Sequence, residues 1–403
     1  MNNTALSKSV DALGNSFSNN VRTLVQLSLD ALNEMYIPEK KVFYEKKKLI
    51  DGKIVYTGES IRYTLINLLG LHKALQYGLT IDFELNEILD YHIENIQKIK
   101  SIGDIGLLLW NCSRIAPEKI TKILPKINFA SILTDYPDAQ KGFTNELAWL
   151  LIGLISASTF NSSFTSVINK LPHEVYKILR NNYGGHGIFS HSTIRGLKTF
   201  SRSRVGSFAD QIYPIYAFTM YSKSFQNEEA LMVAKECGET IVKHQGEQGQ
   251  WWWHYDSLTG KILSKYPVYS VHQDSMAKLA LSMLGKAINR NFSEEILKGA
   301  RWMDGDNSMN KTMFDLENRM IYRRISPLKV NRISNIIFSL LGKEKLPKKN
   351  SLRTLYETWS YHYGWILFAH SNVMKKNNKI EGKSKKTSNK EDKHNPTIFS
   401  IND

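Results

Sequence analysis

Cysteine is scarce in this chain of 403 residues, which contains only Cys112 and Cys237. Two cysteines so far apart exclude a disulfide framework and a cysteine-rich zinc module, and they indicate a reducing compartment. Long apolar runs are also missing, because the longest, Leu147 to Ala157, has about half of the roughly 20 residues that cross a bilayer. The segment 1–20 has no apolar run of signal-peptide type. We therefore expect a cytoplasmic protein.

Familiar catalytic motifs are absent as well. The chain has no GxxxxGK followed by Ser or Thr, no GxGxxG after a strand pattern, no HExxH and no GxSxG. These absences argue against nucleotide hydrolysis, dinucleotide redox chemistry and serine esterase chemistry. His254, His272 and Asp274 have no recognised metal-ligand spacing. We expect neither a metal ion nor a cofactor.

Positive charge is abundant but unevenly distributed. The formal net charge is +15, and the stretch from Lys375 to Lys393 has eight lysines against three acids. A second basic cluster consists of Lys343, Lys345, Lys348 and Lys349. The excess reflects either an AT-rich genome or binding of a polyanion or an anionic membrane surface through the basic tail. The chain lacks an RNA-binding aromatic signature and a helix-turn-helix pattern, so we expect no specific nucleic-acid partner.

Helical periodicity recurs from one end of the chain to the other. Apolar residues from Val21 to Leu32 mark a first helix, and about twelve to fourteen helices in all are joined by short connections. This pattern predicts an all-α fold, an α/α toroid of about six helical hairpins. We expect one toroid domain at 20–374, between an N-terminal extension at 1–19 and a basic, disordered tail at 375–403.

Three segments interrupt the helices: 48–56, 251–269 and 314–324. Each has two short β-prone runs around a turn, and the first contains Asp51-Gly52. They predict short β-hairpins at one rim of the toroid, with ordinary connecting loops as the alternative.

The segment 249–277 is the richest in reactive and aromatic side chains. On an extended strand Trp252, His254 and Asp256 share one face. Such a face suits a sugar, because an aromatic ring stacks on its C–H edges while a carboxylate and an imidazole handle protons. We predict that Trp252 stacks on substrate and that His254 and Asp256 are catalytic. The alternative is that the tryptophans fill the core and His254 and Asp256 form a satisfied surface pair.

A helix start follows directly after this strand pattern. Ser270 and Gln273 have the spacing of a capping box, which places His272, Gln273 and Asp274 in the first helical turn. An acid there gains from the helix dipole and lies within reach of a substrate at the rim. We predict that His272 and Asp274 complete the acid/base set and that Gln273 binds substrate. The alternative is that Asp274 only complements the dipole.

The run Gly249-Gln250-Trp251, Tyr255-Asp256, Thr259-Gly260, Tyr266-Pro267 and His272-Gln273-Asp274-Ser275-Met276-Ala277 resembles the six-hairpin glycosidase-like proteins, which are α/α toroids. Unsaturated glucuronyl hydrolases of this group have a Gly-x-Trp strand, an Asp, and then a helix start rich in small residues. The resemblance implies a carbohydrate-active enzyme. However, His272-Gln273-Asp274 stands where their pattern has Glu-Thr-Ser, so their hydration mechanism does not transfer intact.

The chain is also similar, over most of its length, to uncharacterised bacterial helical proteins encoded among polysaccharide-assembly genes. Three phrases recur there in the same order: Gly58-Glu-Ser-Ile-Arg62-Tyr63-Thr, Asn145-Glu146-Leu-Ala-Trp149-Leu-Leu and Ser207-Phe-Ala-Asp210-Gln211-Ile-Tyr213-Pro214. This similarity carries little known chemistry.

These phrases contain polar clusters at the starts of predicted helices. If the ring closes, the clusters converge on one cavity mouth, where arginines suit a uronate carboxylate or a phosphate. For each residue, an exposed helix cap or a structural salt bridge is the alternative. The predicted substrate-binding residues, besides Trp252 and Gln273, are Arg62, Tyr63, Glu146, Trp149, Asp210, Gln211, Tyr213, Arg323 and Glu357.

Three classes of function are open at this point. The first is a carbohydrate-active enzyme, a glycoside hydrolase, lyase or epimerase, that acts on a glycan or glycosyl intermediate by acid/base catalysis. The second is a terpene-cyclase or prenyltransferase-like toroid with a lipid substrate, although the chain has no DxDD-type motif. The third is a non-catalytic component of a polysaccharide assembly system. A polar cavity with carboxylates favours the first, a dry aromatic cavity the second, and a filled centre the third.

Overall fold

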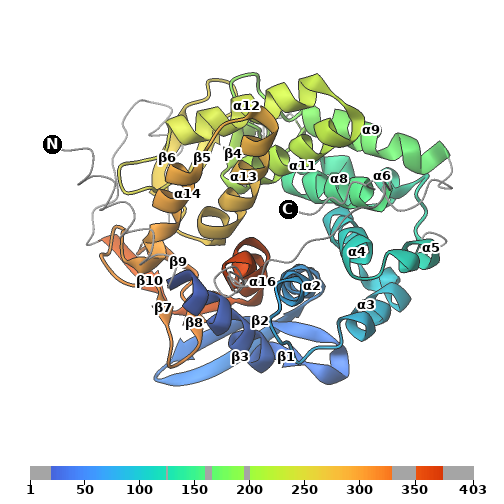
Figure 1. The fold of residues 1–403 in the computed structure, drawn as a ribbon. Coiled ribbons are helices and arrows are strands. Elements are labelled where there is room, and N and C mark those ends of the chain that lie inside the picture. Colours follow the sequence, from blue (N-terminus) through green and yellow to red (C-terminus); the bar gives the residue numbers. More distant parts are fainter. Residues whose placement is uncertain (1–19, 124–125, 159–165, 195–199, 329–350, 375–403) are drawn as a thin grey trace, which may run out of the picture.

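The computed structural model describes residues 20–123, 126–158, 166–194, 200–328 and 351–374, without the side chains of 166–169, 200–201 and 327. Within these ranges the helices form an inner and an outer layer around one axis (Figure 1). The structure therefore confirms the predicted toroid with short β-hairpins. The predicted extension at 1–19, the basic cluster at 343–349 and the tail at 375–403 lie outside the described residues.

The inner layer is a closed ring of six helices. In this ring α2 packs on α4, α4 on α8, α8 on α11 and α11 on α13, and α16 closes the ring by packing on α2 and on the turn before α13. That turn is the π-helical segment η5 (His272–Met276). The inner helices are α2 (Ile61–Gln76), α4 (Ile102–Ile115), α8 (Thr144–Ser158), α11 (Ala209–Phe225), α13 (Ala277–Ile288) and α16 (Ser360–His370).

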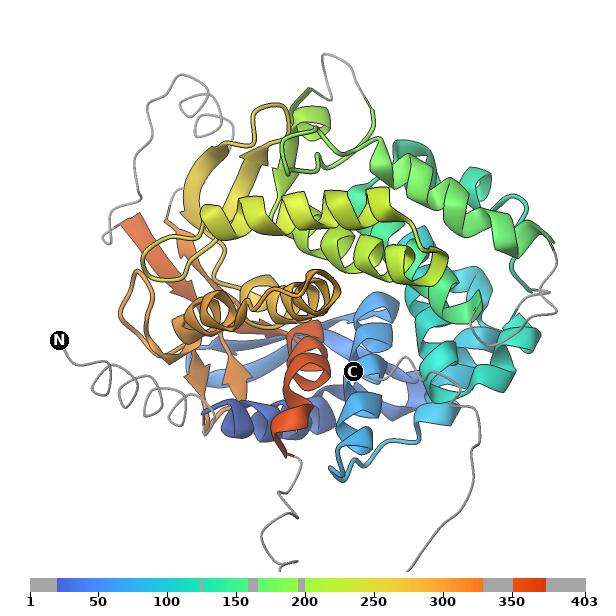
Figure 2. The ribbon, with the colours of Figure 1, turned by 45° about the horizontal axis from the view of Figure 1, so that its top comes forward.

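The outer helices cover this ring, as Figures 1 and 2 show for α9, α12 and α14. The first outer helix runs over 20–35, and a short α10 (Phe200–Arg204) precedes β4. The others are α3 (Leu85–Glu94), α5 (Ile120–Ile123), α6 (Ile132–Asp135), α7 (Pro137–Lys141), α9 (Ser166–Arg180), α12 (Glu228–Lys243) and α14 (Ser293–Ala300). Single 3-10 turns are η1 (Pro38–Lys40), η2 (Ile96–Lys98), η3 (Pro117–Lys119), η6 (Arg301–Asp304) and η8 (Ser371–Met374).

Burial explains which helices lie inside. In α8 every residue from Thr144 to Ala157 except Asn145 is buried, as a helix surrounded on all sides requires. By contrast, α12 buries one stripe at helical spacing and turns its other faces to solvent. This stripe consists of Ala230, Val233, Ala234, Cys237, Gly238 and Ile241.

Two glycines let α4 and α8 approach closely. A Cβ on Gly106 would lie 2.3 Å from the carbonyl oxygen of Trp149, and one on Gly153 would lie 2.1 Å from the carbonyl oxygen of Gly106. Any side chain at either position would force the two backbones apart. The close approach brings Glu146, in the first turn of α8, against the first turn of α4.

The three predicted hairpins are all present. The first turns at Asp51-Gly52, where both residues have positive φ, as a tight hairpin turn requires. The hairpins are β2 (Val42–Ile50) with β3 (Lys53–Ser60), β5 (Trp252–Asp256) with β6 (Ile262–Pro267), and β7 (Phe314–Asp315) with β8 (Met320–Ile321). The remaining strands are β1 (Tyr36–Ile37), β4 (Val205–Ser207), β9 (Arg324–Pro327), β10 (Leu352–Leu355) and β11 (Glu357–Trp359).

The strands gather where the inner helices begin. β3 leads directly into α2, β4 into α11, β6 into η5, and β11 into α16. β2 pairs with both β3 and β11, so it joins the first and last parts of the ring. Glu34 of the first outer helix reinforces this joint, because it accepts hydrogen bonds from the buried Lys47 and from Arg319. We call the rim at which the inner helices begin the mouth of the ring.

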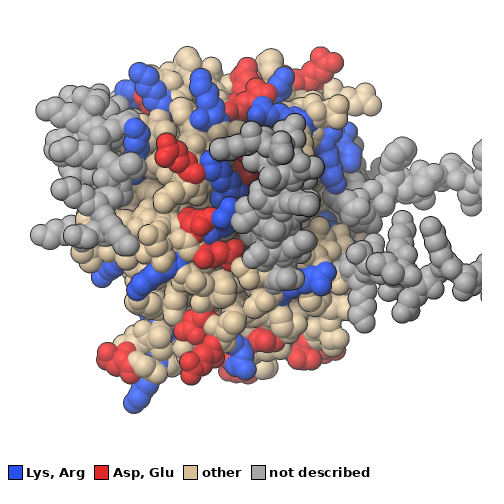
Figure 3. Space-filling view, turned by 60° about the vertical axis from the view of Figure 1, so that its left-hand side comes forward, with Lys and Arg blue, Asp and Glu red and all other residues tan. Residues whose placement is uncertain are grey.

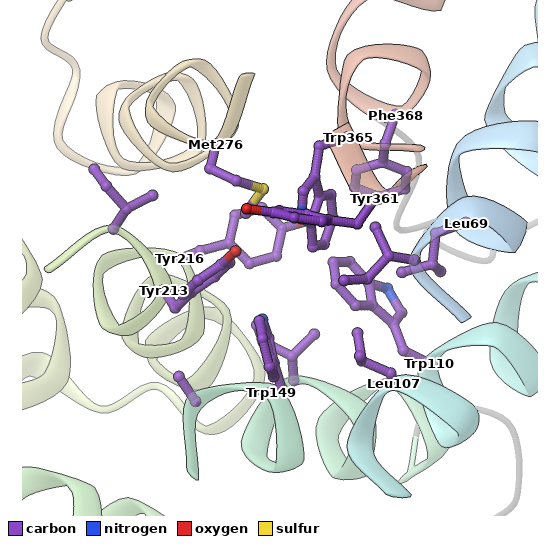
Figure 4. Packing of buried hydrophobic residues seen from close by; sticks show 14 of the residues in the cluster. Leu69, Leu107, Trp110, Trp149, Tyr213, Tyr216, Met276, Tyr361, Trp365 and Phe368 are labelled. Carbon is purple, nitrogen blue, oxygen red and sulfur yellow. The ribbon is translucent and has the colours of Figure 1, made fainter. Parts of the chain in front are cut away.

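Aromatic side chains fill the axis behind the mouth (Figure 4). Trp110 lies between Tyr216, Trp365 and Phe368, with ring centroids 5.8, 6.2 and 5.2 Å away. Rings at these distances pack as a dense core. The centre of the ring is therefore occupied by the protein's own side chains.

Charge on the described surface is mixed. Figure 3 shows Lys and Arg interspersed with Asp and Glu over the face that it turns forward. Most of the basic excess falls outside the described residues: 329–350 has six basic residues against one acid, and 375–403 has eight against four. The predicted polyanion or membrane contact of the tail stays a prediction. Among the described helices, none is long and apolar enough to cross a bilayer.

Candidate functional site

The first turns of the inner helices bring one closed circuit of side chains together at the mouth. Figure 4 shows Trp149, Tyr213 and Tyr361 of this circuit turned toward the same central space. Four inner helices (α2, α8, α11 and α16) and the turn η5 before α13 contribute a side chain, and α4 joins through Asp104, which contacts Arg62. The Arg62 guanidinium carbon lies 5.1 Å from the ring centroid of Trp149. From there the distances between successive ring centroids are 4.9 Å to Tyr213, 5.8 Å to His272, 6.4 Å to Tyr361 and 4.6 Å to Tyr63, which closes the circuit because it is the sequence neighbour of Arg62.

A charged wall occupies one side of this circuit. The guanidinium of Arg62 donates from Nε to Asp104 Oδ1 at 2.5 Å, and its Nη1 lies 2.8 Å from Glu146 Oε1. Burial raises the pKa of Glu146 and of Asp104, and the positive charge of Arg62 acts in the opposite direction on both. The structure thus brings together Arg62 and Glu146, both predicted from sequence, with Asp104, which was not.

A histidine and a carboxylate stand next to this wall. His191 Nδ1 lies 3.1 Å from both carboxyl oxygens of Asp210, which is 1% exposed and also accepts from Ser207 N at 2.8 Å. The charge of Asp210 raises the pKa of His191, and the nearby Glu146 adds to this effect. The His191 side chain is 31% exposed, so part of its ring is open to solvent. This arrangement is that of a histidine held and polarised for proton transfer.

Sequence reasoning missed His191, although it identified Asp210. Nineteen positions separate the two residues, and no motif connects them. The predicted residue Gln211 supplies the link, because its buried side chain accepts from Phe189 N at 2.8 Å and donates to Phe189 O at 3.0 Å. Gln211 therefore fixes the backbone that carries His191, rather than facing the mouth. The backbone of His191 in turn accepts from Thr144 N at the start of α8.

The π-helical turn η5 carries both His272 and Asp274, which were predicted to be catalytic, but it places them in different surroundings. His272 is half-buried in the circuit, and burial lowers its pKa to about 4, so its ring is neutral at pH 7. Asp274 is fully buried behind it, where it accepts from Trp302 Nε1 at 3.1 Å and Ser275 Oγ at 2.8 Å and lies 3.4 Å from His362 Nε2. Its carboxylate supports the turn from inside.

The predicted capping box at this turn is wrong. The side chain of Gln273 does not return to the helix start, because it accepts from Trp251 N at 3.2 Å and donates to Gly299 O at 2.8 Å. The hydroxyl of Ser270 instead lies 3.2 Å from His272 Nδ1. Gln273 is 1% exposed and ties the hairpin strand to the helix, which leaves it no surface at the mouth.

The register of the β5–β6 pair shifts on both sides of His254, but the extra residues lie on β6, and β5 stays in unbroken register with β4 from His254 to Asp256. The predicted common face of Trp252, His254 and Asp256 stays a prediction. Trp252 is 5% exposed and donates from its indole to the carbonyl of His244 at 2.7 Å. Asp256 forms a bidentate pair with Arg204 at 2.9 and 2.6 Å. His254 is half-buried in the β4–β5–β6 sheet. The catalytic roles predicted for His254 and Asp256 stay predictions.

The remaining predicted residues, Arg323 and Glu357, lie beside the circuit. The Arg323 guanidinium stacks 3.4 Å above the ring of Trp359, and its Nε is buried without a hydrogen-bond partner. Glu357 accepts from Trp359 Nε1 at 3.1 Å, and its carbonyl accepts from Arg323 N at 2.8 Å. Glu357 therefore positions the Trp359–Arg323 stack. Sequence reasoning did not select Tyr361.

A pocket of about 480 Å³ opens from the circuit toward the β2–β3 hairpin. Its floor includes Arg62, Tyr63 and Asp104, and Trp359 forms one side. Carboxylates of β2 and β3 face it, as do two lysines of the segment before α4. These residues are Glu45, Glu59, Lys98 and Lys100. Across the described ranges no three His, Cys, Asp or Glu side chains are grouped so that they could hold a metal ion.

No protein-family model and no curated protein matches this sequence. Solved structures match its fold. An unsaturated glucuronyl hydrolase specific for heparin has a TM-score of 0.55 at 14% identity, over 88% of this chain and 96% of that chain. A mutant unsaturated glucuronyl hydrolase from Streptococcus agalactiae, complexed with dGlcA-GalNAc6S, has a TM-score of 0.55 at 13% identity, over 89% and 92%. A family 88 glycosyl hydrolase from Bacteroides vulgatus has a TM-score of 0.56 at 11% identity, over 88% and 99%.

Identities this low carry information about the fold and not about the reaction. The matches extend over nearly the whole of the solved chains, so the likeness concerns the complete ring and not one hairpin. This chain has the same α/α-toroid fold as those solved structures.

Proposed function

We propose that this chain is a carbohydrate-active enzyme that binds the end of a glycan at the mouth and acts on it by acid/base catalysis. One observation carries the proposal: beside the charged wall of the circuit, a buried aspartate holds a partly exposed histidine. Aromatic surfaces and hydroxyl-binding groups around one proton-transfer residue suit a sugar ring. The reaction class is hydrolysis, elimination or epimerisation.

His191 is the acid/base residue in this proposal. Asp210 fixes the ring through Nδ1 and stabilises the imidazolium form, which leaves Nε2 to exchange a proton with the substrate. Glu146 lies near His191 and is the second carboxyl group at the mouth. His272 stays neutral at pH 7 and serves as a hydrogen-bonding partner for a hydroxyl group, not as an acid.

Trp149 and Tyr213 supply the sugar-binding surface. The indole Nε1 of Trp149 is buried without a hydrogen-bond partner, and the side chain is only 5% exposed. A buried N–H of this kind costs free energy unless a ligand accepts from it. A sugar hydroxyl that reached Trp149, whose ring Figure 4 shows turned toward Tyr213 and Tyr361, would satisfy it.

Arg323 is the receptor proposed for an anionic group of the substrate. Asp104 and Glu146 already neutralise Arg62, whereas Arg323 rests on Trp359 with an unsatisfied Nε. A guanidinium stacked on an indole is well placed for a bidentate contact with a carboxylate. Several proteins of this fold are unsaturated glucuronyl hydrolases, and one was solved with dGlcA-GalNAc6S. Unsaturated glucuronyl disaccharides are therefore the first substrates to test.

The filled axis weighs against a lipid substrate. In a toroid that encloses a lipid, the chain lies along the axis, which Trp110, Trp365 and Phe368 occupy here. The second candidate is a non-catalytic glycan-binding component of an assembly system. It is favoured by the filled axis, and also by the Arg62 contacts, because a carboxylate engaged by arginine is a weak base.

The test is an assay of the full chain with unsaturated glucuronyl disaccharides and with saturated disaccharides of the same composition. Products are followed by mass spectrometry and by the ultraviolet absorbance of the conjugated double bond. We expect turnover of at least one class, and its loss in His191→Asn. Saturable binding without any product supports the non-catalytic candidate. Neither binding nor turnover across the panel would overturn both.

A further inference from the structure

Arg62 occupies an unusual place among the charged residues of the mouth. Its side chain is 28% exposed toward the pocket, while its two carboxylate partners are 13% exposed, for Asp104, and 9% exposed, for Glu146. Its Nε donates to Asp104 Oδ1. Its Nη1 lies 2.8 Å from Glu146 Oε1, and its Nη2 donates to Glu146 Oε2 at 3.0 Å. One guanidinium thus fixes the distance between carboxyl groups from two different helices.

The rest of the surroundings cannot replace this arginine. Ser101 Oγ lies 2.8 Å from Asp138 Oδ2 and also contacts Glu146 Oε2, but its single proton serves one of them at a time. Backbone N–H groups at the start of α4 complete the set, from Ile102 to Asp138 and from Gly103 to Glu146, both at 3.1 Å. Arg62 thus contacts two carboxyl groups, and Ser101 links the third, that of Asp138, to the same cluster.

Other charged groups face this cluster from neighbouring elements. His191 lies near Glu146 on the loop before β4, and Arg323 lies beyond Tyr63. On the pocket side, carboxylates and lysines are equal in number. These are Glu45 and Glu59 on the hairpin, and Lys98 and Lys100 before α4.

We propose that Arg62 is the positioning residue of the Asp104–Glu146 carboxyl pair: it holds the two groups side by side at the mouth and keeps them ionised at neutral pH. Two buried carboxyl groups that lose their shared cation take up one proton between them. Burial raises the pKa of both groups, and the positive charge of Arg62 is the largest effect that lowers it. The expected effect of Arg62 on turnover rests on the proposed function, whereas its expected effect on the protonation of Asp104 and Glu146 does not.

The first test needs no substrate. Thermal midpoints of wild type, Arg62→Gln and Arg62→Gln/Glu146→Gln are measured from pH 5 to pH 8. A raised carboxyl pKa in the folded state makes stability fall as pH rises, so Arg62→Gln should lose most stability at the alkaline end. The double variant should lose this pH dependence. A constant deficit across the pH range in Arg62→Gln would overturn the proposal.

The second test measures the pH–rate profile of turnover and applies if the disaccharide assay detects a substrate. The acid limb of the pH–rate profile should move to higher pH by about one unit or more in Arg62→Gln, and Arg62→Lys should restore part of the shift. Arg204→Gln is the matched control, since it breaks a bidentate arginine–aspartate pair outside the circuit. An unmoved limb in Arg62→Gln, or an equal shift in the control, would contradict the positioning role. If no substrate turns over, the thermal test still decides the proposal.

Discussion

Two polar clusters of this molecule make opposite use of the same residue types. The hairpin and turn at 251–276 contain histidines, aspartates and tryptophans close together in sequence, but the aspartates are buried: Asp256 is held by Arg204, and Asp274 by Trp302 and Ser275. The other cluster comes from helix starts far apart in sequence. In this cluster His191 and Arg62 remain partly exposed, at 31% and 28% of their side chains, while their partners Asp210 and Glu146 are buried. Exposure and pairing, and not density along the chain, distinguish a reactive group from a structural one.

The comparison predicts its largest effect at His191. His191→Asn removes the proton-transfer group and should lower turnover by about 10²–10⁴-fold, with little change in the thermal midpoint, because the side chain is partly exposed. His186→Asn is the matched control, since His186 is exposed on the same segment, five residues earlier. Equal turnover in wild type and His191→Asn would remove His191 from the site.

Asp274 should show the reverse behaviour. Asp274→Asn breaks a buried network with Trp302, Ser275 and His362, and we expect a loss of roughly 2–4 kcal/mol in the free energy of unfolding. Denaturant unfolding measures this loss. A variant of normal stability with no turnover would instead support the catalytic role that the sequence suggested for Asp274, and would break the comparison.

The architecture was predictable, because helical periodicity and turn chemistry are local. The Asp51-Gly52 turn forms as predicted, and the convergence of Arg62, Glu146 and Asp210 at one rim followed from their places at helix starts. The register between β5 and β6 was not predictable in detail. A bulge depends on which backbone groups the partner strands offer, and that information lies outside the segment.

The partners of the site residues were equally hidden. Ser101 reaches Glu146 because α4 and α8 pack closely at Gly106 and Gly153, and the same hydroxyl contacts Asp138. The sequence shows two helical glycines but not which helices they join. A pairwise contact between distant helices is a tertiary property, so the charge balance at the mouth could be read only from the structure.

A smaller effect is expected when the charge behind His191 is removed. Asp210 raises the pKa of His191, so Asp210→Asn should move the histidine's inflection to lower pH by about one unit or more. Nuclear magnetic resonance titration of the imidazole reports this shift without substrate, and the pH–rate profile should move in the same direction. His191 titrating at the same pH in both proteins would show that Asp210 only supports the backbone.

The smallest effect is expected at Asp256, in the hairpin. Burial would raise its pKa, but hydrogen bonds from Arg204, Leu258 N and Thr259 outweigh burial and lower it. A carboxylate with a lowered pKa stabilises the fold at pH values above its unfolded-state pKa, and it loses that contribution as pH falls through its folded-state pKa.

Asp256→Asn should therefore cost roughly 1–2 kcal/mol in the free energy of unfolding at pH 7, and this deficit should narrow below about pH 4. Urea unfolding at both pH values measures the deficit, and turnover should stay normal. A variant that unfolds like wild type but does not turn over substrate would place Asp256 in the reaction, and the contrast between the two clusters would fail.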